Sequence, residues 1–135
     1  MKPIKFLALD VGERRIGVAA AESTTKLAYP LTTIEVDGTE IEQLSLLVKD
    51  EHTSHLVVGY PRNLQGDPTK QTAIVETFVT RLASFNLPIT YQDESLTSVE
   101  AEKYLASKKK PYSKADIDAY AATVILTDYM ESHYA

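Results

Sequence analysis

Apolar and polar positions alternate along the chain in blocks that predict five strands and four helices. The predicted strands are, in order, residues 4–9, the return stretch up to Ala19, residues 27–36, residues 55–59 and residues 87–92. The first run is apolar at every position but Lys5, which suits a strand that is covered on both faces. Pro30 places the third strand at an edge or a bend, because proline has no N–H to donate to a neighbouring strand.

Helical periodicity and capping patterns predict the helices. They cover residues 40–52, residues 67–85, a stretch that begins at residue 97 and a stretch that opens at residue 113. Three of them begin with the capping-box pattern, in which an acidic residue follows a serine or threonine by three positions: Thr39 with Glu42, Thr97 with Glu100, and Ser113 with Asp116. Asp67-Pro68 predicts an N-cap followed by proline in the first turn of the second helix, and Asn86 ends that helix.

The order of these elements predicts a single α/β domain over residues 1–135. Three strands in succession form an antiparallel unit, and the two later strands alternate with helices, which is typical of parallel pairing. We therefore expect a mixed five-stranded sheet, with three antiparallel N-terminal strands and then two parallel ones, flanked by helices. A chain of 135 residues can bury a core of this kind without covalent staples.

Composition narrows the environment and the partners. The chain has no cysteine, which removes disulfides and thiolate metal sites from consideration. No apolar run approaches the ~20 residues of a membrane span, so we expect a cytoplasmic protein without a membrane partner. The net charge of −5 argues against nonspecific coating of nucleic acid. Basic residues nevertheless cluster locally: Arg14 and Arg15, Arg62 with Lys70, and Lys108, Lys109 and Lys110 with Lys114.

Carboxylates stand where the predicted fold would bring them together. Asp10 follows the first buried run, and Asp93 and Glu94 follow the fifth. Successive side chains of a strand point to opposite faces, so only one of that pair can be the partner of Asp10. Asp118 lies near the start of the last helix, on its small and apolar face, and Gly17 allows another group to approach closely. The pattern alone leaves open that Asp118 only complements the helix dipole.

A cluster of carboxylates without cysteine or a nearby histidine suits Mg²⁺ or Mn²⁺ better than Zn²⁺. Two such ions activate a water and stabilise the leaving oxygen in phosphodiester cleavage, so a metal-dependent nuclease is the sharpest hypothesis. His52, His55 and His133 fit a helix end, a strand start and the end of the chain, and we assign them no role. The chain has no nucleophile-elbow, Walker or dinucleotide-binding motif. A nucleotide-binding module of the sugar-kinase and actin class is a minor alternative. That class closes two such domains over the nucleotide, and 135 residues provide only one.

Four segments, in order and at suitable spacing, resemble the YqgF/RuvX family: residues 9–19, 57–66, 93–97 and 117–126. The resemblance covers nearly the whole chain and implies a ribonuclease-H-like fold. It also implies a cytoplasmic nuclease that matures the 5′ end of pre-16S rRNA, although family members have been described as Holliday junction resolvases as well. By similarity, Asp10, Glu94 and Asp118 are the catalytic, metal-binding acids, which are the positions that the strand ends and the helix face also pick out.

Two departures from the family pattern concern the grip on the substrate. The chain has Ala21-Glu22 where the family usually has Ser-Asp, and Ser95 where it usually has arginine. The loss of a guanidinium removes a bidentate phosphate contact that serine cannot reproduce. The residues that we expect to hold a phosphate backbone instead are Arg15, Arg62, Lys108, Lys109 and Lys110.

Structured RNA is the substrate that this interpretation favours. Cleavage of branched DNA is the first alternative, and it demands a two-fold dimer that spans a symmetric junction. A catalytically inactive domain that binds RNA or nucleotides is the second. The sequence leaves open whether the protein is a monomer or a homodimer and whether it cuts from an end or internally.

Overall fold

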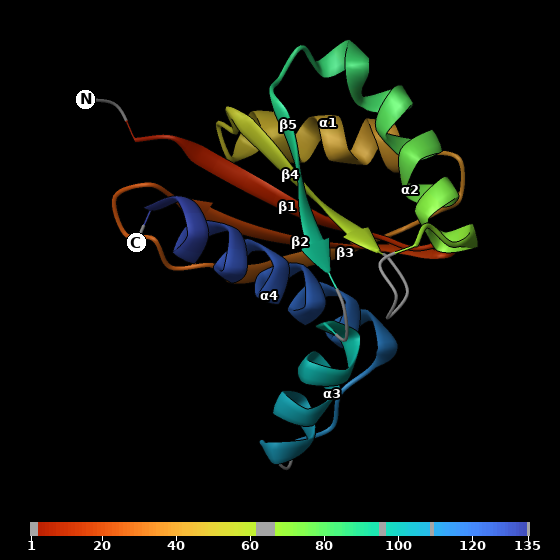
Figure 1. The fold of residues 1–135 in the computed structure, drawn as a ribbon, viewed down its shortest axis with the longest axis vertical. Coiled ribbons are helices and arrows are strands. Elements are labelled where there is room, and N and C mark those ends of the chain that lie inside the picture. Colours follow the sequence, from red (N-terminus) through yellow and green to blue (C-terminus); the bar gives the residue numbers. More distant parts are fainter. Residues whose placement is uncertain (1–2, 62–66, 95–96, 109, 135) are drawn as a thin grey trace.

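A mixed five-stranded sheet lies at the centre of the protein, with the strand order β3-β2-β1-β4-β5 (Figure 1). The computed structural model describes residues 3–61, 67–94, 97–108 and 110–134. The strands are β1 (Lys5–Val11), β2 (Arg15–Glu22), β3 (Tyr29–Glu35), β4 (His55–Pro61) and β5 (Ile89–Glu94). The first three strands pair antiparallel, and β4 and β5 add in parallel on the other side of β1. This arrangement confirms the predicted sheet and places Pro30 in an edge strand.

Helices cover both faces of the sheet. They are α1 (Glu40–Asp50), α2 (Lys70–Arg81) with a short 3-10 turn η1 (Leu82–Phe85), α3 (Thr97–Ser107) and α4 (Lys114–Tyr134). In Figure 1, α1 and α2 lie on one side of the sheet and α4 lies on the other. Among the described residues, every helix falls short of the length and apolar content that crossing a bilayer requires.

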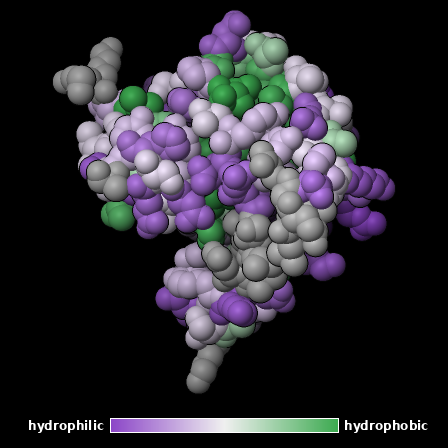
Figure 2. All heavy atoms as spheres, viewed as in Figure 1, coloured by the Kyte–Doolittle hydropathy of each residue, from purple (hydrophilic) through white to green (hydrophobic). Residues whose placement is uncertain are grey.

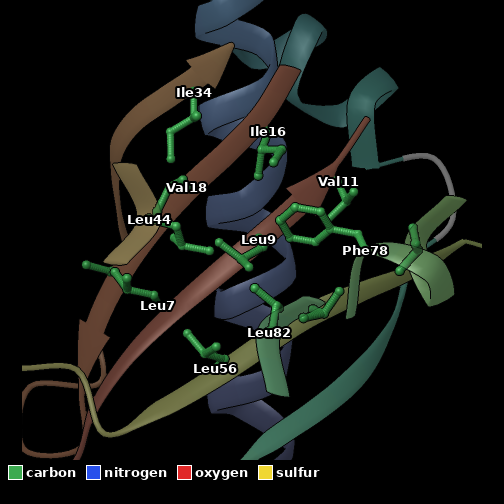
Figure 3. Packing of buried hydrophobic residues seen from close by; sticks show 13 residues of the cluster. Leu7, Leu9, Val11, Ile16, Val18, Ile34, Leu44, Leu56, Phe78 and Leu82 are labelled. Carbon is green, nitrogen blue, oxygen red and sulfur yellow. The ribbon is translucent and has the colours of Figure 1, made fainter. Parts of the chain in front are cut away.

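Alternation along β1 separates two cores. Leu9 packs with Leu44 of α1 and Phe78 of α2 in one apolar cluster (Figure 3). Ala8 points the other way and belongs to a second cluster with Ile125 of α4. Full burial of a large aliphatic or aromatic side chain contributes about 1.5–3 kcal/mol, so both clusters stabilise the sheet against its helices.

Small residues let α4 lie unusually close to the sheet. Ala19 and Ala21 of β2 face Ala122 of α4 in the second cluster. At Gly17 the approach is closest: a Cβ placed there would overlap the carbonyl oxygen of Asp118 and lie 2.9 Å from the amide nitrogen of Ala119. The close approach that the sequence predicts for Gly17 is therefore confirmed, and the group that approaches is the helix backbone.

The helix starts match the predicted caps only in part. Ser113 and Asp116 form the predicted reciprocal pair, with the Ser113 amide 2.9 Å from Asp116 Oδ2 and the Asp116 amide 3.2 Å from Ser113 Oγ. Thr39 is the N-cap of α1 as predicted, but the capping box is absent, because the Thr39 amide and hydroxyl donate to Asp37 Oδ1 and its side chain makes no capping hydrogen bond. An aspartate two residues earlier offers the threonine a local turn that competes with the cap.

The second helix begins later than predicted. Lys70 is its first residue and Thr69 is the N-cap, so the prediction of a cap at Asp67 is wrong. Thr69 and Thr72 bond reciprocally, and the Thr72 hydroxyl donates to the carbonyl oxygen of Pro61, which ties the helix start to β4. The predicted stop at Asn86 is confirmed by its left-handed backbone, with φ 55°. The Thr97-Glu100 pattern involves side chains outside those described, although α3 does begin at Thr97.

Candidate active site

Asp10 is the polar end of an otherwise apolar row on β1. Phe6 and Ala8, its predecessors on the same face, are buried in the cluster under α4. Because side chains alternate along a strand, Asp10 points to this face as well. Asp10 therefore stands at the end of this row, at the edge of the space between the sheet and α4.

Two glycines flank Asp10 in the neighbouring strands. Gly17 of β2 is its register partner, and Gly59 of β4 follows by extension of the parallel register. A Cβ at Gly59 would overlap the carboxylate of Glu94 and lie 2.6 Å from Ile125 Cδ1. The side chain of Glu94 thus crosses β4 over Gly59, from β5 toward β1.

The carboxylates of Asp10 and Glu94 are in direct contact. The pKa of Asp10 is raised well above its ordinary value, first by burial, then by the negative charges of Glu94 and Asp118, and by a hydrogen bond to Glu94. A hydrogen bond between two carboxyl groups requires a proton, and burial of like charges favours keeping one. The structure therefore brings the three acids that the sequence singles out into one electrostatically coupled group.

The guanidinium of Arg15 holds the carboxylate of Asp118. Arg15 Nε donates to Asp118 Oδ2 at 2.6 Å, and both side chains are about a quarter exposed, at 27% and 23%. Arg15 lies in β2, two positions before Gly17, so the tight approach of α4 at Gly17 also delivers Asp118 to this guanidinium. Among the described residues, no three or more aspartate, glutamate or histidine side chains are arranged closely enough to enclose one ion.

The Arg15–Asp118 pair is expected to contribute about 1 kcal/mol to stability, because partial exposure limits an ion pair to a modest value. A double-mutant cycle with Arg15→Ala and Asp118→Asn, followed by urea unfolding, measures this coupling directly. Destabilisation by Arg15→Ala in the wild-type background should largely vanish in the Asp118→Asn background. Strictly additive effects of the two substitutions would contradict the pairing.

Asp93 lies on the opposite face of β5 from Glu94. It lines a shallow polar hollow with Tyr60, Glu76 and Tyr91. Glu94, and not Asp93, is the neighbour that perturbs Asp10. The alternation argument from the sequence therefore agrees with the structure.

The structure describes three of the five predicted phosphate-binding residues. Lys108 and Lys110 are exposed on the connector between α3 and α4, and Arg15 is engaged with Asp118. Arg62 and Lys109 lie outside the described residues, as does Ser95. Their binding roles stay predictions.

The histidines have environments that suit structural roles. His55 lies between the rings of Phe6 and Tyr129, its Nε2 is 2.8 Å from Thr90 Oγ1, and burial lowers its pKa. His133 stacks on Tyr129. None of these contacts involves the carboxylate group.

Gly59 is the site residue that the sequence reading missed. A glycine in a buried, otherwise apolar strand has no side chain to pack, and it often marks the place where another group comes close. In this chain the signal is Gly59 at the end of the apolar run of residues 55–59, which forms the strand beside that of Asp10.

Comparisons with known proteins identify similar sequences. The family described as "RuvX: Holliday junction resolvase" matches residues 4–132. A protein of Crocosphaera subtropica named "Putative pre-16S rRNA nuclease" is 43% identical over 100% of this chain and 98% of its own length. A protein of the same name from Roseiflexus sp. is 42% identical over 97% of this chain and 96% of its own.

Solved structures resemble the fold at low sequence identity. T. thermophilus RuvC in complex with a Holliday junction substrate aligns with a TM-score of 0.60 and 12% identity, over 96% of this chain and 94% of RuvC. The Fowlpox virus resolvase in a Holliday junction complex aligns with a TM-score of 0.57 and 11% identity, over 96% of this chain and 98% of the resolvase. These likenesses confirm the ribonuclease-H-like fold class.

Proposed function

The chain belongs to the RuvX family, and we propose that it is a metal-dependent nuclease that processes the 5′ end of pre-16S rRNA in the cytoplasm. Relatives that are 42–43% identical over nearly their whole length are named "Putative pre-16S rRNA nuclease". The observation that carries the chemistry is the contact between Asp10 and Glu94, with the charge of Asp118 close enough to raise the pKa of Asp10.

The donor atoms fit a hard divalent cation. All three side chains offer carboxylate oxygens, which Mg²⁺ and Mn²⁺ prefer, and no cysteine occurs in the chain. Two buried carboxylates in contact repel each other once both are ionised, and a cation between them would relieve that repulsion. Asp10 and Glu94 are therefore the pair that would hold a metal ion between them, and Asp118 at the rim would be the third carboxylate to contribute.

When bound, such a metal supplies an activated water and stabilises the oxygen that leaves the phosphorus. Side chains of the protein hold a proton and position charge around this site. Asp10 and Glu94 share a proton in the metal-free site, and this lowers the cost of their burial. Arg15 holds Asp118 at the rim and brings a positive charge beside the place where a substrate phosphate would lie.

Cleavage of two substrates side by side tests this proposal. A 5′-extended small-subunit rRNA fragment and a four-way DNA junction are incubated with the protein in Mg²⁺ or in EDTA. We expect Mg²⁺-dependent cutting of the RNA and none in EDTA, because the carboxylates alone do not activate water.

Each outcome has a definite meaning. Cutting of the junction alone, by a stable dimer, would replace the rRNA substrate with branched DNA. Binding that persists in EDTA without any cleavage in Mg²⁺ would replace the nuclease with a binding domain. Size-exclusion chromatography with light scattering, run on the same sample, decides between monomer and homodimer.

A further inference from the structure

Helix α3 projects from the body of the protein as an arm. In Figure 1 it extends away from the sheet, and it packs against α4. Figure 2 shows that the visible surface of this region is mostly hydrophilic. An arm of this kind buries little of its surface, so its aromatic side chains need an explanation beyond a core.

Two tyrosines stack where the arm meets α4. The rings of Tyr104 on α3 and Tyr120 on α4 are 4.4 Å apart between centroids and tilted by 24°. Tyr104 is nevertheless 40% exposed. Tyr120 and Lys108 both contact the ring, and the exposed part of Tyr104 is where a further planar group would meet it.

The stack is fixed by hydrogen bonds and a lysine. Tyr120 and Lys108 both bond to the hydroxyl of Tyr104, and this lowers the pKa of Tyr104. Burial and the same bond raise the pKa of Tyr120 to about 12. Lys108 Nζ lies 4.9 Å from the centroid of the Tyr104 ring. The ring is thus held in place beside an exposed cation.

Charge around the stack favours an anionic strand. Residues 97–116 carry five lysines and three acidic residues, in a chain whose net charge is −5. Four of the lysines follow α3, and one of the acids, Asp116, is the partner of the Ser113 amide at the start of α4. The stretch from the end of the arm to the start of α4 is therefore a basic region on an acidic protein.

The stack lies across α4 from the carboxylates. Tyr120 follows Asp118 by two residues, which is roughly 3 Å along the helix axis and about 200° around a helix about 10–12 Å in diameter. Stacked nucleotides advance about 3.4 Å each along a strand. A strand at Asp118 would pass around α4 and reach the stack after several nucleotides.

From these contacts we propose that Tyr104, backed by Tyr120 and flanked by Lys108, is a stacking platform for unpaired nucleotides of the substrate strand that pass around α4, several nucleotides from the scissile bond. The proposal rests on the nuclease function above and adds the kind of nucleic acid that the site prefers. Bases stack on aromatic side chains whatever their sequence, because every base has a π face, while nearby cations follow the backbone.

A second exposed tyrosine has surroundings that do not favour an anionic strand. Tyr29 is 49% exposed, but it lies at the other end of the sheet, where partial burial and then the negative charges of Glu51 and Glu22 raise its pKa. Negative charge there would repel a strand. Tyr29→Leu therefore serves as a matched control for the loss of an exposed tyrosine.

Binding without cleavage tests the platform. A fluorescent 12-nucleotide RNA and the 12-base-pair duplex of the same sequence are titrated in EDTA with the wild type, Tyr104→Leu, Tyr104→Phe, Lys108→Ala and Tyr29→Leu. We expect Tyr104→Leu to weaken single-strand binding about tenfold. Duplex binding should be unaffected, because paired bases are not free to stack. Tyr104→Phe should retain most of the affinity, Lys108→Ala should reduce the salt slope by about 0.7, and Tyr29→Leu should change nothing.

Photocrosslinking gives a readout that does not depend on affinity. The same RNA with one 5-iodouridine should crosslink to peptides that contain Tyr104 or Tyr120. Crosslinks elsewhere, or equal single-strand affinities for wild type and Tyr104→Leu, would overturn the platform while leaving the nuclease intact. Conversely, a platform that crosslinks in a protein that cuts neither substrate would survive the failure of the proposed reaction. Circular dichroism of Tyr104→Leu confirms that α3 is still formed.

Discussion

Asp10→Asn is expected to reduce Mg²⁺-dependent RNA cleavage by about a thousandfold or more, which corresponds to about 4 kcal/mol of transition-state stabilisation. Asp10 lies on β1, the central strand of the sheet, and its carboxylate contacts Glu94 and feels the charge of Asp118. An amide keeps the shape but offers neither a negative charge nor two oxygen donors for a cation. Initial rates on the 5′-extended rRNA fragment measure the loss.

The same substitution should not destabilise the metal-free protein. An amide at position 10 can donate to the Glu94 carboxylate without taking up a proton, so the melting temperature in EDTA should stay the same or rise. Asp93→Asn is the matched control, because Asp93 is on the opposite face of β5, and it should cleave at the wild-type rate. An Asp10→Asn protein that is folded and fully active would contradict the carboxylate site, whatever substrate is used.

Gly59→Ala is expected to reduce cleavage about a hundredfold while costing little stability. The new Cβ would take the space of the Glu94 carboxylate and would lie 2.6 Å from Ile125 Cδ1. Both obstacles are ends of flexible side chains that can move, so we expect a loss of about 1–2 kcal/mol in the free energy of unfolding. Cleavage suffers more, because Glu94 can no longer lie across β4 beside Asp10.

Gly17→Ala is the informative contrast. At that position the new Cβ meets the backbone of α4 at Asp118 and Ala119, which cannot move without shifting the whole helix. We expect a loss of about 3 kcal/mol or more in unfolding free energy, measured by urea denaturation. If Gly59→Ala destabilises as much as Gly17→Ala, or leaves cleavage at the wild-type rate, the placement of Glu94 over Gly59 does not matter for the reaction.

The sequence was a good guide to the elements and a poorer guide to their ends. Apolar runs and helical spacing predict the five strands and the helices that cover them. Burial on one or both faces of an element produces a repeating pattern of apolar residues in the sequence. Helix α1 begins at Glu40 as predicted, but its capping box is absent because Asp37 draws the bonds of Thr39. Helix α2 begins later than predicted, where Thr69 pairs with Thr72. Capping is decided by local competition among neighbouring polar groups, which a spacing rule does not contain.

For the candidate site, the sequence by itself determined which residues stand at strand ends and on which helix face. Alternation separates Glu94 from Asp93, and the helical period turns Asp118 toward the sheet; the resemblance to the RuvX family agrees with both. These are local regularities of the chain, so they can be read without coordinates.

Only the tertiary structure decided how the side chains meet. Glu94 reaches Asp10 because Gly59 leaves room above β4, and Asp118 meets Arg15 because Gly17 admits the backbone of α4. The stack of Tyr104 on Tyr120 likewise joins two helices through packing. Such contacts depend on the distance between elements that are far apart in the chain, and that distance is set by the whole core and not by any one segment.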